Sequence, residues 1–207
     1  MKTLLFQGDS ITDCGRCQTG GAGYPAVELG PGYPGLLASR IWCDRPTENW
    51  RILNRGISGN RVVDLYARWK KDAINLQPDI ISILIGVNDT WHEKAEQNGV
   101  EVPRYEEFYR RLLSWTRETL PAVRFVLLEP FVLQFDPEWV PEIDARRAVV
   151  KRIAAECDAT FVPLQERFRE CCRLAAPEYW LVDGVHPTPA GHQVIADAWL
   201  QIAGKLL

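Results

Sequence analysis

Two continuous apolar runs in the middle of the chain constrain the fold more than any other feature. They are DIISILIG (79–86) and VRFVLLEP (123–130), and both are rich in β-branched and aliphatic residues. Neither run alternates apolar and polar side chains, as a strand with one wet face would. Such runs are typical of strands that are covered on both faces, as in a parallel sheet between two helical layers. The two runs therefore predict buried central strands that need helices on either side.

Strand and helix patterns alternate along the rest of the chain. Strands are expected at 3–6, 51–56, 79–86, 123–130 and 160–164. Helices are expected around 38–42, at 60–76, 104–120 and 138–157, and from an N-cap and N1 pair, Thr188 and Pro189, onward. The least regular stretches are 13–34, 91–103 and 131–141. This order predicts one α/β domain over residues 1–207, with a mostly parallel sheet and helices on both of its faces.

Length and charge exclude several classes of protein. The 207 residues suit one domain with a sizeable core, and the net charge of −3 gives no electrostatic footprint for nucleic acid or an anionic membrane. No segment approaches the ~20 apolar residues that a membrane helix needs. The first apolar run, TLLF, is too short for the core of a signal peptide, so a cytoplasmic location is expected.

The six cysteines are expected to be free thiols, which is the usual state in a chain without a signal peptide. Cys14 and Cys17 have the C-x-x-C spacing of a metal or redox pair. A zinc site needs a second such pair, and the adjacent Cys171 and Cys172 do not supply one. We therefore expect no metal and no cofactor. Cys14 follows the first strand closely enough to line a site at its end.

Reactive groups are expected in the loops after the strands, because ligands of parallel α/β folds bind beyond the carboxyl ends of the strands. GDSIT (8–12) follows the first strand and places the hydroxyl of Ser10 at its tip. A serine nucleophile needs a base, and the chain has three histidines. His186 follows Asp183 at D-x-x-H spacing, so one short loop can present an imidazole and a carboxylate that orients it. By itself this spacing also fits a simple turn into a helix.

The remaining candidates are two histidines and the groups that could donate hydrogen bonds to an oxyanion. His92 is expected in a solvated loop near the strand ends, where it could touch a ligand, and His192 is expected as a surface or packing residue of the last helix. Gly56 and Gly59 in NRGISGN can turn backbone N–H groups outward, or they only form a tight turn. Asn88 in GVNDTW can offer its side-chain N–H groups to a developing negative charge, or it caps the following segment.

In this order, the four blocks GDS, G-x-S-G-N, G-x-N-D and D-x-x-H-P resemble those of the SGNH hydrolases, the GDSL esterase/lipase superfamily. The resemblance covers the chain from end to end and implies a flavodoxin-like three-layer α/β/α domain with a five-stranded parallel sheet. It implies that Ser10 is the nucleophile, that His186 is the general base and that Asp183 orients His186. It also implies an oxyanion hole formed by the N–H groups of Ser10 and Gly59 and by the side chain of Asn88.

Longer stretches such as GDSITDCGR and DGVHPTPAGH resemble the carbohydrate-esterase branch, whose members are similar to acetylxylan esterases. This resemblance implies hydrolysis of O-acetyl esters on a sugar substrate, such as acetylated xylo-oligosaccharides, by an enzyme that could form homo-oligomers. Trp91 and Trp180 are candidate stacking surfaces for sugar rings, although most of the eight tryptophans are expected to fill the core. Asp9, beside Ser10, is a further candidate for substrate contact.

Two alternatives to this function stay open at the level of the sequence. One is a lipolytic hydrolase of the lysophospholipase or thioesterase type, which would need a long apolar groove. The other is a carbohydrate-binding module that keeps the fold without catalysis, although binding alone needs no activated serine. Activity on long acyl chains would identify the first, and failure of a phosphonate to label Ser10 would identify the second.

Overall fold

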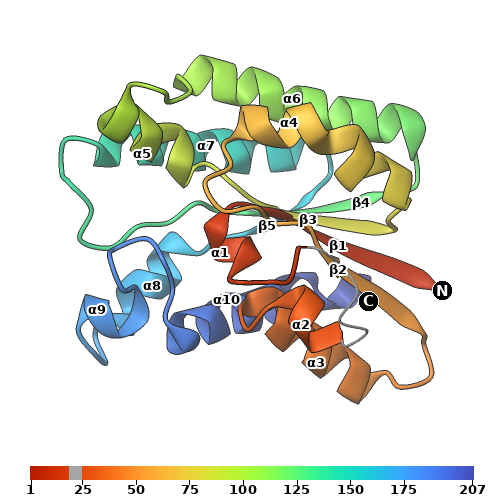
Figure 1. The fold of residues 1–207 in the computed structure, drawn as a ribbon. Helices are drawn as coiled ribbons and strands as arrows, with labels where there is room; N and C mark the ends of the chain where they lie inside the picture. The colour runs from red at the N-terminus through yellow and green to blue at the C-terminus, as the bar shows by residue number, and fades with distance from the viewer. Residues whose placement is uncertain (19–24) are drawn as a thin grey trace.

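A parallel sheet forms the centre of the computed structural model, which describes residues 1–18 and 25–207. Its five strands, counted over that part of the chain, are β1 (Lys2–Gly8), β2 (Trp50–Asn54), β3 (Ile80–Leu84), β4 (Arg124–Leu128) and β5 (Thr160–Val162). All neighbouring strands run parallel, in the order β2-β1-β3-β4-β5 (Figure 1). This is the strand order of flavodoxin-like folds. The predicted fold class is confirmed.

Helices cover both faces of the sheet (Figure 1). One face carries α4 (Val62–Asp72), α6 (Val102–Thr119) and α7 (Val140–Glu156), and the other carries α3 (Tyr33–Asp44) and α10 (Pro189–Ala203). A further helix, α5 (Val87–Glu96), follows β3 directly. Shorter helices are α1 (Ser10–Asp13), α2 (Pro25–Leu29), α8 (Gln165–Cys171) and α9 (Pro177–Trp180), with 3₁₀ turns η1 (Ile74–Leu76) and η2 (Gly204–Leu206).

The core is divided by the sheet into two layers. In β1, Leu4 and Phe6 pack into the layer beneath α3 and α10, whereas Leu5 packs into the layer beneath α4 and α6, and all three are fully buried. Every residue of β3 is buried. Successive side chains of a strand point to opposite faces. A strand with apolar residues at every position therefore buries all of its side chains only when it lies between two helical layers. This is the arrangement that the run at 79–86 predicted.

The structure differs from the expected elements in three places. The helix expected over 60–76 ends at Asp72, because Ala73 leaves the helical conformation at a φ of −133°, and η1 follows. The stretch 91–103 was expected to be irregular, but it contains the second half of α5, which ends where Gln97 adopts a left-handed φ of 53°. Within the stretch 13–34, which was also expected to be irregular, residues 25–29 form α2, and residues 19–24 lie outside the described residues.

The loops after the first three strands converge at one edge of the sheet. From β1 the chain crosses to β2 on one side, and β3 pairs with the other side of β1, so the order of the strands reverses at this point. Ligands of open α/β sheets bind where the strand order reverses. The Ile57 N–H donates to the Gly8 carbonyl at 3.1 Å, which joins the loop after β2 to the end of β1. Over residues 1–18 and 25–207, no helix is both long and apolar enough to cross a membrane.

Candidate active site

Ser10 is the first residue of α1, directly beyond the end of β1. Asp9 caps this short helix, since its Oδ1 accepts a hydrogen bond from the Ile11 N–H at 3.0 Å. The helix lasts four residues and ends at Cys14, whose φ of 40° turns the chain out of the helical path. Ser10 is half-buried, so its hydroxyl is held at the tip of the strand with access to solvent.

A line of hydrogen bonds joins Ser10, His186 and Asp183. The Ser10 Oγ lies 2.8 Å from His186 Nε2, and His186 Nδ1 lies 2.7 Å from Asp183 Oδ2. Partial burial acts to raise the pKa of Asp183, but hydrogen bonds from His186 and from the Val185 N–H outweigh it and hold that pKa below its ordinary value. Asp183 therefore carries its negative charge at neutral pH and can orient the imidazole and stabilise its protonated form.

The loop that carries both groups is fixed by backbone contacts. Leu181 and Pro187 form an isolated antiparallel bridge, and the Val182 N–H donates to the His186 carbonyl at 2.8 Å. Gly184 has a φ of 84°, and a Cβ placed there would lie 2.2 Å from the Leu133 carbonyl oxygen. Only glycine suits this position, because it combines a left-handed conformation with a close backbone approach. The Asp-Gly dipeptide at 183–184 is the sequence signal for this turn.

Asp9 does not lie open to a ligand, which corrects its expected role in substrate contact. Its side chain is 1% exposed and serves as the cap of α1. Burial raises the pKa of Asp9 to about 7, while the hydrogen bond from Ile11 and the charge of His186 act in the opposite direction. An aspartate just before a helix is a common N-cap, so the sequence did carry a signal for this structural role.

The backbone N–H groups of Ser10 and Gly59 have no acceptor in the part of the chain that the structure describes. Gly59 has a φ of 81°, a conformation that other residues rarely adopt. Asn88 is almost buried, and its Nδ2 donates to the Asn60 carbonyl at 3.1 Å, which ties the start of α5 to the loop that carries Gly59. Free N–H groups of this kind are what an oxyanion hole requires.

Gly56 does not turn its N–H outward, because that N–H donates to Asn54 Oδ1, and Gly56 instead allows a close approach of two backbones. A Cβ on Gly56 would lie 2.4 Å from the backbone nitrogen of Asp13. The Asn54 side chain reinforces this contact, because its Nδ2 donates to the Thr12 carbonyl at 2.7 Å while its Oδ1 accepts from the Gly56 N–H at 2.9 Å. The loop after β2 is therefore packed directly onto α1.

The two tryptophans expected at the site differ in their placement. The Trp91 ring centroid lies 5.8 Å from that of His186 and 6.1 Å from that of Phe135. Trp180 instead packs against the hydrophobic core and edge-on against Tyr179, and in the described residues its ring makes no contact with His186. Of the two, the structure brings only Trp91 beside the histidine of the candidate triad.

The other two histidines are also placed by the structure. His92 lies in α5, and not in a loop as expected, because its helix begins immediately after β3. A Cβ on Gly59 would lie 3.9 Å from His92, so this ring is close to the site. His192 is 4% exposed, so it is a packing residue and not a surface one.

Cys14, the C-cap residue of α1, is in contact with this buried histidine. The Tyr33 N–H donates to His192 Nδ1 at 3.2 Å, which leaves the ring proton on Nε2, and Nε2 lies 3.2 Å from Cys14 Sγ. Burial lowers the pKa of His192 to about 4, so the ring is neutral. Burial also raises the pKa of the Cys14 thiol. This pair is therefore a structural contact, in which histidine donates and sulfur accepts.

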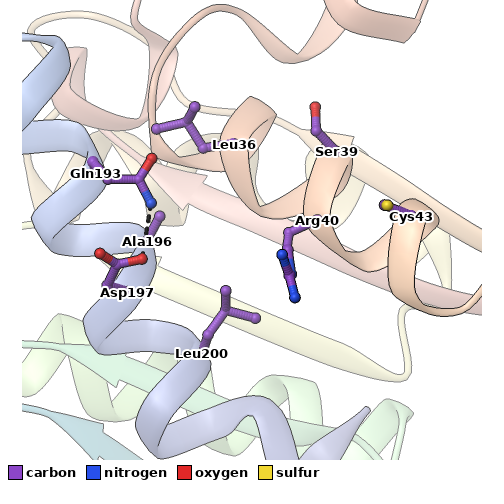
Figure 2. Close-up of a pocket in the computed structure, with 8 residues that line it drawn as sticks. All are labelled: Leu36, Ser39, Arg40, Cys43, Gln193, Ala196, Asp197 and Leu200. Carbon is purple, nitrogen blue, oxygen red and sulfur yellow. Dashed lines mark hydrogen bonds between the residues drawn. The ribbon is translucent and has the colours of Figure 1, made fainter.

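A hollow of about 570 Å³ lies between α3 and α10 (Figure 2). Its lining residues are Leu36, Ser39, Arg40, Cys43, Gln193, Ala196, Asp197 and Leu200. The polar ones pair along their own helices, as Gln193 does with Asp197 at 2.8 Å. The hollow is an open groove between two helices, and it is not lined by any of the candidate catalytic groups. Among residues 1–18 and 25–207, no group of three His, Cys, Asp or Glu side chains could hold a metal ion.

Comparison with known proteins agrees with this geometry. The GDSL-like lipase/acylhydrolase family matches residues 6–194. An acetylxylan esterase from Geobacillus stearothermophilus is 38% identical over 97% of this chain and 93% of its own length. A solved structure of the Geobacillus acetylxylan esterase Axe2 has a TM-score of 0.87 at 37% identity, covering 97% of this chain and 93% of that one. A solved protein from Parabacteroides merdae, described as a candidate GDSL-like lipase, reaches a TM-score of 0.94 at 40% identity, with 98% of this chain and 95% of that one covered.

With the fold and the site, these matches define a class of enzyme: the protein is a carboxylic ester hydrolase. It belongs to the GDSL-like lipase/acylhydrolase family, as the four sequence blocks indicated.

Proposed function

We propose that the protein is a serine esterase that removes small acyl groups, acetyl above all, from carbohydrate esters such as acetylated xylo-oligosaccharides. The observation that carries the proposal is the line of hydrogen bonds from Ser10 through His186 to Asp183, at 2.8 and 2.7 Å. A serine, an imidazole and a carboxylate in this order form the arrangement that activates a hydroxyl for acyl transfer.

The reaction proceeds in two halves. His186 Nε2 takes the proton of Ser10 as Oγ attacks the ester carbonyl, and the carbonyl oxygen becomes negatively charged. The N–H groups of Ser10 and Gly59 and the side chain of Asn88 donate hydrogen bonds to this oxyanion. His186 then gives its proton to the departing alcohol, which leaves an acetylated Ser10. A water molecule activated by the same imidazole attacks this acyl group and releases acetate and free Ser10.

Two solved relatives support the role of the histidine and the aspartate. They are described as catalytic mutants of Axe2, one with a histidine and one with an aspartate replaced by alanine. The two replaced residues have the same D-x-x-H spacing as Asp183 and His186 in this chain. This agreement favours the same roles for the two residues here.

The choice of an acetylated sugar as substrate is supported by one relative and one side chain. The relative from Geobacillus stearothermophilus that is 38% identical is an acetylxylan esterase, and Axe2 is described as an acetyl-xylooligosaccharide esterase. Trp91 presents an aromatic surface next to His186, where a sugar ring that carries the ester could stack. We include Trp91 in the proposed substrate site and assign Trp180 to packing. A homo-oligomer is part of the same proposal, and light scattering of the purified protein measures it.

A substrate panel tests the proposal. Initial rates are measured for p-nitrophenyl acetate, p-nitrophenyl octanoate and peracetylated xylose, with the wild type and with Ser10→Ala. Acetyl esters are expected to be the better substrates, and Ser10→Ala is expected to abolish turnover and labelling by a phosphonate. Preference for octanoate would favour the lipolytic alternative. Retained turnover in Ser10→Ala would refute the nucleophile.

A further inference from the structure

The loop formed by residues 57–61 is fastened by charged side chains that the proposed chemistry does not use. On one side of Gly59, the Asp13 carboxylate accepts two hydrogen bonds from Ser58 at the same oxygen. The Ser58 N–H donates to Asp13 Oδ2 at 3.0 Å, and the Ser58 hydroxyl donates to it at 2.9 Å. Ser58 is therefore held by its backbone and its side chain at once.

The other side of Gly59 is fastened by Arg68, which projects from α4. Its Nε donates to the Asn60 Oδ1 at 2.7 Å. The same guanidinium donates to Gln7 Oε1 at 3.0 Å and reaches the Gly8 carbonyl at 3.4 Å. Arg68 thus connects the loop to the end of β1, immediately before Ser10.

Gly59 lies between these two anchored neighbours. The direction of its N–H is set by the ψ of Ser58 and by its own φ of 81°, and both depend on where Ser58 and Asn60 are held. The Asn60 N–H donates to the Ile57 carbonyl at 3.1 Å, which closes the turn, and the Asn60 carbonyl accepts from Asn88. Ser58 and Asn60 therefore determine both the direction of the Gly59 N–H and the position of the Asn88 side chain.

Asp13 is buried, and within the described residues one of its two carboxylate oxygens accepts no hydrogen bond. Asp13 is 4% exposed, and the oxygen without a partner is Oδ1, with the Arg16 Nε 3.9 Å away. Burying a carboxylate costs free energy unless its lone pairs are satisfied. A chain that keeps such a group close to its reactive serine gains a fixed geometry in return.

We propose that Asp13 and Arg68 are positioning residues for the oxyanion hole, which act through the loop 57–61. This inference rests on the proposed function, because it assumes that the Gly59 N–H and Asn88 stabilise an oxyanion. Neither side chain touches the substrate. Each holds a neighbour of Gly59, so that the donors are in place before the charge develops, which is the condition under which such donors are most effective.

The test uses Asp13→Ala and Arg68→Met, with Asp13→Asn as the conservative variant and Arg117→Met as a matched control. Like Arg68, Arg117 is half-buried on a helix and donates to a backbone carbonyl, that of Cys157 at 3.1 Å, but it stacks over Phe125 near the start of β4. The kcat and KM for p-nitrophenyl acetate, the melting temperature and the inhibition constant of an alkylboronic acid are measured for each protein. The boronic acid forms a tetrahedral adduct with serine, so its affinity reports on the oxyanion donors.

Asp13→Ala and Arg68→Met are expected to lower kcat and boronic acid affinity in parallel, by about 10- to 100-fold, with KM changed by less than about threefold. Asp13→Asn keeps an oxygen that can accept from Ser58 and should retain most of the activity, and Arg117→Met should retain all of it. Unchanged kcat in the first two variants, or an equal loss in Arg117→Met, would overturn the proposal. If Asp13→Ala does not fold, the kcat and boronic acid affinity of Arg68→Met alone decide between the two outcomes. A wild type that neither hydrolyses the ester nor binds the boronic acid would overturn the proposed function and this inference with it.

Discussion

Replacing Asp183 by asparagine and by alanine separates two effects of its carboxylate. Oδ1 accepts from the Val185 and His186 N–H groups at 3.1 and 2.8 Å, and Oδ2 faces His186 Nδ1 at 2.7 Å. In Asp183→Asn, the two backbone donors hold the amide oxygen at the Oδ1 place, so the NH₂ group takes the Oδ2 place. A donor there makes His186 Nδ1 the acceptor and moves the ring proton to Nε2. The imidazole then cannot accept the proton of Ser10.

The two substitutions are expected to differ in the size of the loss. In Asp183→Ala no group favours the wrong tautomer, and the loss is that of one hydrogen bond to a charged group, about 1.5–3 kcal/mol, or about 10- to 150-fold in kcat. The Asp183 and His186 side chains are 44% and 41% exposed, so water can replace part of the carboxylate and the loss should lie near the lower limit. Asp183→Asn should lose about 10⁴-fold, the effect of the same change in a Ser-His-Asp triad.

The assay is kcat for p-nitrophenyl acetate at pH 8, with melting temperatures to show that both variants are folded. The expected order is wild type, then alanine, then asparagine, and the more conservative substitution is the more damaging one. An alanine variant slower than the asparagine variant would refute the tautomer argument. Full activity in both would remove Asp183 from the mechanism.

Three further predictions concern single side chains. Asn88→Ala should lower kcat by about 10²–10³ with little change in KM, and a loss below about tenfold would exclude Asn88 from the oxyanion hole. Trp91→Ala should raise KM for acetylated xylose about three- to tenfold but leave p-nitrophenyl acetate almost unaffected; equal effects on both substrates would contradict stacking. Asp9→Asn keeps the cap of α1 but cannot ionise. Because burial raises the pKa of Asp9 from 3.8 to about 7, the folded wild type retains a proton that the unfolded chain loses, and its stability falls as pH rises between these values. The melting temperature of Asp9→Asn minus that of wild type should therefore grow from pH 5 to pH 8, and a constant difference would contradict the shift.

The strands and the long helices could be predicted from the sequence because their patterns are local. A run such as 79–86, which does not alternate apolar and polar residues, fits only a strand that is covered on both faces. The helices α6 and α7 begin and end within a few residues of the expected limits. The short helices α1, α2, α8 and α9 have four to seven residues, which is too few for a helical period to show. The second half of α5 was not predicted because its residues are mostly polar and show no apolar period. Its helical conformation depends on where the end of β3 places the chain.

The candidate site could be predicted in part. Ser10, Asp183 and His186 stood out because reactive residue types followed strands or preceded a helix, and only three histidines had to be sorted. Asp13 and Arg68 gave no such signal, because Asp13 meets Ser58 across 45 residues and Arg68 meets Gln7 across 61.

The buried position of His192 could have been inferred from its own helix. It shares a face with Ile195, Ala196 and Trp199 at helical spacing, and all of these residues are buried. The period of that helix therefore predicted an inward histidine, although not the cysteine that it meets.

The contact of Gly184 with the Leu133 carbonyl has a consequence for attempts to change the substrate range. The segment after β4 is an obvious place to change the fit of the sugar, since Phe135 packs beside Trp91, the side chain proposed to stack on a sugar ring. The same segment supports the turn between Asp183 and His186, and the Leu133 N–H donates to the Gly184 carbonyl at 2.8 Å. A library that varies the segment will therefore also disturb the alignment of His186, the proposed general base. Directed evolution of this enzyme should hold Leu133 and Gly184 constant, and seek new specificity from Phe135 and Trp91.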